Sequence, residues 1–154
     1  MWNTDIEIFN IETVSSDFTP CITAIKNGNV DALKVLLELD ADPNKRFYQF
    51  DRDVHECDGY RIISYPIIFA VIEGNLEMVE LLYKHGANLN VFLEEEEWNS
   101  YTKTIHKRSA LSCAIDYRNQ EVCDFLIEHG IEDNDTTEEI DLMCKRRSRI
   151  FTSI

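Results

Sequence analysis

The sequence predicts a single domain of the all-α class, built as a solenoid of stacked helix pairs with extended hairpin or loop fingers and a cap at each end. Three segments of the chain align with one another without gaps, which is typical of a repeat protein. Each segment has apolar residues at helical spacing, and long connections separate the segments. With 154 residues, of which 44% are hydrophobic, the chain has enough apolar material for one core.

The N-terminal segment, residues 1–18, is expected to cap the stack. Ile6, Ile8 and Ile11 are apolar, with Phe9 among them, and both a helix and a strand remain open for this segment. The start of the chain has acidic residues and no early basic residue, so we do not expect a secretory signal.

Each of the three aligned segments is predicted to fold into two short helices. Pro20 and Pro66 fit the first position of a helix, where a backbone N–H is not needed, and Gly28 and Gly74 suit its end. His129, like the equivalent histidine one repeat earlier, is expected to interact with free carbonyls in the last turn of the second helix. The predicted repeats are 19–44, 65–90 and 109–134, with helix pairs at about 20–39, 66–85 and 110–129.

The repeats resemble the ankyrin repeat, whose pattern begins Thr-Pro-Leu-His and continues through Gly-Asn to Leu-Leu-x-x-Gly-Ala-Asp-x-Asn. Thr19-Pro20, Gly28-Asn29 and Leu36-Leu37 match this pattern. The resemblance implies a non-catalytic module that binds other proteins through its hairpin tips and inner helix face.

Three positions depart from that pattern. The family histidine is replaced in all three repeats, so its hydrogen-bond network should be absent. In the third repeat Ala110 replaces the proline and Arg118 replaces the glycine. A left-handed residue other than glycine costs on the order of 1 kcal/mol, so strain is expected at Arg118. The residues that replace the histidine are Ile22, Ile68 and Ser112.

The repeats recur at longer intervals than an ankyrin repeat of about 33 residues. Because the helices align without gaps, the extra length must lie in two insertions, at 45–63 and 91–108, on one edge of the stack. Asp58-Gly59 is a turn signal within the first insertion.

The insertions supply the candidate partner-binding residues, because aromatic anchors carry much of the binding energy at protein interfaces and carboxylates could form a rim that selects a basic partner. Two alternatives stay open: the aromatic residues pack the insertions onto their own domain, or the run Glu94–Glu97 is only a solvated surface. The candidates are Phe47, Tyr48, Phe50, Asp51, Asp53, Glu94, Glu95, Glu96, Glu97, Trp98 and Tyr101.

The C-terminal segment, residues 135–154, is expected to form a second cap. Its predicted helix opens with Glu138 and Glu139, and Ile140 would help to cover the third repeat. The basic residues that follow suit the C-terminal end of a helix.

Charge narrows the class of partner. With 29 acidic and 15 basic side chains the net charge is −14, which disfavours nucleic acid and membrane surfaces and favours a basic protein. No apolar stretch approaches the ~18 residues of a membrane span. The favoured function is an acidic inhibitor, such as an immunity protein that neutralises a basic toxin. The alternative is a viral or bacterial effector that mimics a host ankyrin inhibitor and sequesters a signalling or transcription factor.

Catalytic and metal sites receive little support. Five cysteines without a Cys-x-x-Cys pair suit a reducing compartment, so the cytoplasm is expected. No phosphate-binding glycine loop, nucleophile elbow or zinc-protease motif is present. We therefore expect no enzyme activity, cofactor, metal or small-molecule substrate. An enzyme or metal site around His55 and His106 is the less favoured alternative.

Overall fold

The structure, a computed structural model, describes residues 15–16, 19–51 and 59–141. Three helix pairs follow one another along the chain, and strands occur before, between and after them. The helices are α2 (Pro20–Lys26), α3 (Val30–Glu38), α4 (Pro66–Ile72), α5 (Leu76–Lys84), α6 (Ala110–Asp116) and α7 (Gln120–Glu128). The strands are β1 (Ser15–Ser16), β2 (Phe47–Asp51), β3 (Gly59–Ser64), β4 (Phe92–Trp98), β5 (Thr102–Ser109) and β6 (Thr136–Asp141).

The helix pairs lie where the sequence predicts them, because their start and stop signals are local. The side chain of Thr19 accepts a hydrogen bond from the backbone of Ile22, and Asn29 accepts one from Ala32. These contacts satisfy N–H groups that have no partner within the helix. Arg118 adopts φ 57° at the position where the earlier repeats have glycine, which is the left-handed conformation on which the expected strain depends.

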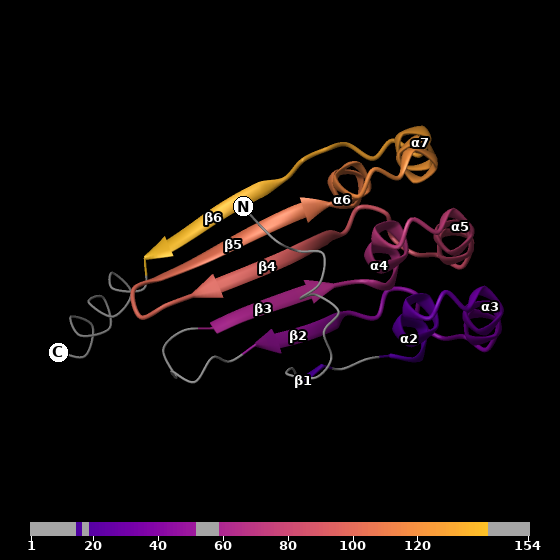
Figure 1. The fold of residues 1–154 in the computed structure, drawn as a ribbon, viewed down its shortest axis with the longest axis horizontal. Helices are drawn as coiled ribbons and strands as arrows, with labels where there is room; N and C mark the ends of the chain where they lie inside the picture. The colour runs from indigo at the N-terminus through magenta and orange to yellow at the C-terminus, as the bar shows by residue number, and fades with distance from the viewer. Residues whose placement is uncertain (1–14, 17–18, 52–58, 142–154) are drawn as a thin grey trace.

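The prediction of an all-α fold is wrong, because the insertions form strands that pair into one antiparallel sheet in the order β1-β2-β3-β4-β5-β6. The spacing of the stack explains this outcome. Packed helices lie about 8–10 Å apart, and neighbouring strands lie about 4.7–4.9 Å apart. The width of two neighbouring strands is therefore about the same as the distance from one repeat to the next. Consecutive hairpins thus meet edge to edge and can pair (Figure 1).

The prediction of a helix that opens with Glu138 and Glu139 is also wrong. Those residues belong to β6, which pairs with β5, and Ile140 lies opposite Lys103 rather than on the third helix pair. An extended segment here satisfies the backbone groups on the free side of β5. Residues 142–154 and most of the proposed N-terminal cap lie outside the described residues, so the two caps stay predictions.

The core lies between the helix layers and the near end of the sheet. Figure 1 shows α2, α4 and α6 in a row beside the sheet, and α3, α5 and α7 in a second row beyond them. Phe47, Ile62 and Leu93 from the strands join the helix side chains in this core. Because side chains alternate along a strand, these three residues define one side of the sheet, the core face.

Candidate functional site

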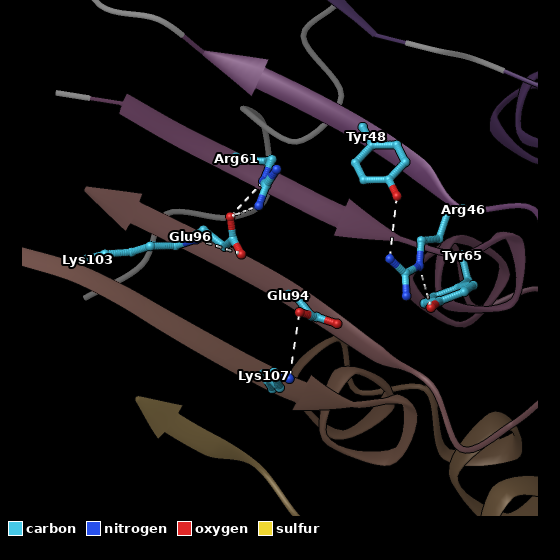
Figure 2. A network of polar contacts seen from close by, with 8 residues as sticks. All are labelled: Arg46, Tyr48, Arg61, Tyr65, Glu94, Glu96, Lys103 and Lys107. Atoms are coloured by element: carbon cyan, nitrogen blue, oxygen red, sulfur yellow. Dashed lines mark hydrogen bonds and ion pairs between the residues drawn. The ribbon is translucent and has the colours of Figure 1, made fainter. Parts of the chain in front are cut away.

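The opposite side of the sheet, which we call the charged face, carries a network of ion pairs across three neighbouring strands (Figure 2). Glu96 of β4 lies between two cations: the Nε of Arg61 donates to its Oε2 at 2.6 Å, and the Nζ of Lys103 lies 3.2 Å from its Oε1. The Nζ of Lys107 lies 3.8 Å from Oε2 of Glu94. The carboxylates in the middle of the sheet are thus neutralised within the molecule. The charged face is defined by Arg61, Glu94, Glu96, Lys103 and Lys107.

Glu95 points to the core face and is only 1% exposed. The hydroxyl of Tyr60 donates to its Oε1 at 3.4 Å, and His106 lies directly across from it on β5. Burial raises the pKa of Glu95, although Arg108, the Tyr60 hydrogen bond and His106 act in the opposite direction. The His106 ring in turn lies 3.0 Å from Oγ1 of Thr137. A row of polar side chains therefore crosses four strands beyond the apolar end of this face.

Three of the candidate contact residues are buried in the structure. Phe47 has no exposed surface, and its ring packs edge-on against Phe69, with 5.2 Å between the ring centroids. Glu95 and Glu96 are buried, so they cannot form a solvated rim. The aromatic ring packs because its strand begins directly on the helix layer, and the carboxylates are buried because cationic and hydroxyl groups surround them.

Four further candidates belong to the first insertion. Tyr48 is half-buried, and its hydroxyl accepts a hydrogen bond from Arg46 at 3.4 Å. Phe50 and Asp51 lie on β2, but their side chains are outside the described part of the chain, and so is the whole of Asp53. The contact role of these four residues stays a prediction.

The tip of the second hairpin exposes two of the candidates. Tyr101 is 62% exposed in the turn between β4 and β5, and Glu97 is exposed near the end of β4. Trp98 is half-buried, and its ring lies so close to Gly59 that a Cβ atom there would overlap it. Tyr101 and Glu97 are accordingly available to a partner, whereas Trp98 also packs within the sheet.

A further run of exposed carboxylates lies elsewhere, on the third repeat and the strand that follows it. Residues 119–141 contain nine carboxylates and no lysine or arginine. Counting charges along the sequence could have shown that the acidic run of the third repeat continues into β6. Those with a described side chain are all exposed. The nine residues are Glu121, Asp124, Glu128, Glu132, Asp133, Asp135, Glu138, Glu139 and Asp141.

The described part of the chain also contains potential metal ligands and a buried thiol. It contains no group of three or more His, Cys, Asp or Glu side chains able to hold a metal ion, and His55 lies outside it. Burial raises the pKa of the Cys113 thiol to about 12, which keeps it protonated near neutral pH. None of the described helices has the length and apolar character that crossing a bilayer requires.

Comparison with protein families gives two adjoining matches. The family described as "Ankyrin repeats (3 copies)" matches residues 48–137, and the family described as "Ankyrin repeat" matches residues 16–47. A search of curated proteins found no match. The two matches run through all three helix pairs and through the strands from β1 to the start of β6.

Proposed function

Since this chain belongs to the ankyrin-repeat family, whose repeats indicate a protein–protein interaction module, we propose that it binds and inhibits a basic protein. Proteins of this family are generally non-catalytic binding modules. The inhibitor would act by covering a functional surface of its partner, as an immunity protein covers a toxin.

The single observation that carries the proposal is the distribution of charge. In the middle of the sheet the carboxylates are paired with Arg61, Lys103 and Lys107, but residues 119–141 present carboxylates with no lysine or arginine among them. An acidic surface of this kind steers a basic partner into contact and repels an acidic one. The exposed Tyr101 supplies an aromatic side chain of the kind that anchors interfaces.

The test compares two variants that lose the same number of charges. The test variant carries Glu128→Gln, Glu132→Gln, Glu138→Gln and Glu139→Gln; the control carries Glu38→Gln, Glu73→Gln, Glu77→Gln and Glu80→Gln, all at exposed sites. The full chain is used to capture its partner, and association rates are then measured over a series of salt concentrations.

We expect a partner with a basic isoelectric point whose activity falls on binding. Association should slow as salt rises, because exposed charges are screened over about 10 Å at 0.1 M. The test variant should associate at least about tenfold more slowly than the control variant. An acidic partner, or equal loss of rate in the two variants, would contradict the proposal.

A further inference from the structure

The sheet ends in two edges of different kinds. β1 consists of only two residues, so it offers little backbone to another strand. β6 has six residues and is paired with β5 on one side, while on its other side no strand of the described residues pairs with it. An open edge of this length is a template for a further strand.

The hydrogen-bond pattern identifies which backbone groups of β6 face outward. Asn99 N–H donates to Thr102 O at 2.9 Å, and in an antiparallel ladder the bonded pairs alternate along the strands. Lys103, Ile105 and Lys107 of β5 therefore turn their backbone groups toward β6, where they meet Ile140, Glu138 and Thr136. The outward N–H and C=O groups of β6 then belong to Thr137, Glu139 and Asp141.

The charges on the sheet indicate what kind of strand this edge would accept. On the charged face, Arg61 of β3 is followed by Glu94 and Glu96 of β4, and these by Lys103 and Lys107 of β5. The series then reaches Glu138 of β6, which lies on the same face, opposite Ile105. The sign of the charge thus alternates from strand to strand, and the next strand in the series would be positive.

The carboxylates of β6 have no such counterpart. Glu138 and Glu139 are exposed on opposite faces of the strand, and within the described residues neither has a cation within ion-pair distance. Lys103 and Lys107 lie on the neighbouring strand but contact Glu96 and Glu94 instead. Pairing β6 with the β6 of a second copy would bring like charges together, which is destabilising.

We propose that the outer edge of β6 binds an extended, basic segment of the partner protein as a seventh strand. This inference rests on the proposed function, and it specifies the form in which the partner is recognised. Backbone hydrogen bonds to Thr137, Glu139 and Asp141 would supply affinity, and lysine or arginine side chains opposite Glu138 and Glu139 would supply selectivity.

Two substitutions at one outward position separate charge from backbone. Glu139→Gln removes the carboxylate, whereas Glu139→Pro also removes the outward N–H and leaves the bonds toward β5, since proline is tolerated on the free side of an edge strand. The probe is a synthetic peptide in which lysine and valine alternate. Its control is the same peptide with N-methyl groups on every second amide, which prevents strand pairing.

The peptide should bind the full wild-type chain and should slow hydrogen exchange at the amides of Thr137 and Glu139. Glu139→Pro should bind at least about tenfold more weakly than Glu139→Gln, and so should the N-methylated peptide with the wild-type chain. Unchanged far-ultraviolet circular dichroism and unchanged exchange at the β5 amides would show that Glu139→Pro keeps its fold.

Three outcomes would overturn the inference. Equal binding of the two peptides would mean that only charge is recognised. Binding that requires replacement of Lys145, Arg146, Arg147 and Arg149 by glutamine would mean that the chain's own basic segment competes for the edge. A captured basic partner that binds wild type and Glu139→Pro equally would remove β6 as the contact but leave the proposed function intact.

Discussion

At the scale of single residues, Glu95 shows how the sheet changes the chemistry of a side chain. It lies within a run of four glutamates, of which Glu97 is exposed and Glu95 is buried beside Tyr60 and His106. The folded protein therefore binds a proton at Glu95 more tightly than the unfolded chain does. The stability that this group contributes is present below its unfolded pKa, about 4.3, and is lost as pH rises through its raised folded pKa.

The stability of the Glu95→Gln variant relative to wild type should therefore increase as pH rises. Glutamine cannot ionise, but it keeps an oxygen that accepts the hydrogen bond from Tyr60. The free energy of unfolding, measured in urea between about pH 4 and pH 7, should rise relative to wild type across that range. Glu80→Gln, at an exposed site on α5, is the control and should show no such trend. A constant difference for Glu95→Gln would contradict this prediction.

Arg118 carries a conformational cost that glycine would remove. Its φ of 57° lies in the left-handed region, as do Gly28 at 63° and Gly74 at 66° in the equivalent turns. The arginine side chain is exposed, and no hydrogen bond or ion pair holds it among the described residues. Arg118→Gly should stabilise the protein by about 1 kcal/mol, measured by thermal unfolding. Arg118→Ala retains the Cβ atom and should give little gain in stability. If both variants were stabilised equally, the loss of the arginine charge would be the cause.

At the scale of elements, the turns also link one repeat to the next. Asn119, the N-cap residue of α7, donates from its Nδ2 to the backbone oxygen of Val71 in α4 at 3.2 Å, and its side chain lies against Gly74. The turn after α4 is thus covered by the third repeat. Around Gly28, by contrast, a Cβ atom would meet nothing within 4 Å.

Alanine at these two glycines should separate backbone strain from contact between repeats. Gly28→Ala should cost about 1 kcal/mol, because only the left-handed conformation opposes it. Gly74→Ala should cost at least about 1 kcal/mol more, because it also displaces Asn119 from its hydrogen bond. Urea unfolding of both variants measures the difference. Gly74→Ala in an Asn119→Ala background is the control, and an undiminished cost there would mean that Asn119 is not the cause.

The elements also differ in how far the sequence could predict them. Proline at the start of α4 and asparagine before α5 are local signals, and the helices lie where those signals place them. The sheet depends on pairing between residues far apart in the sequence, such as Arg61 with Glu96, and that pairing follows from the stacking of whole repeats. β6 has no apolar alternation, and the burial of Glu95 arises only when neighbouring strands surround it. The sequence could therefore place the candidates Phe47, Glu95 and Glu96 on the insertions but could not predict their burial, and the acidic residues of β6 were not among its candidates.

At the scale of the whole molecule, the repeats stack in one direction, and the exposure of equivalent residues shows which side of a repeat its neighbour covers. Ile25, Val71 and Ile115 occupy the same place at the end of the first helix of each pair. Ile25 is 1% exposed, Val71 is completely buried and Ile115 is 51% exposed. This position therefore faces the following repeat, and the third repeat has no fourth helix pair against it within the described residues.

The same substitution at the two ends of this series should have unequal effects. Ile25→Ala empties a buried site beneath the second repeat and should cost about 2–5 kcal/mol, whereas Ile115→Ala removes atoms that are half in water and should cost less than about 1 kcal/mol. Both free energies come from urea unfolding, with an unchanged dependence on urea concentration as the check that both variants unfold as wild type does. Equal costs would show that Ile115 is covered in solution. Sedimentation at the same protein concentration would then reveal whether a second copy provides the cover, in which case the cost at Ile115 should fall on dilution.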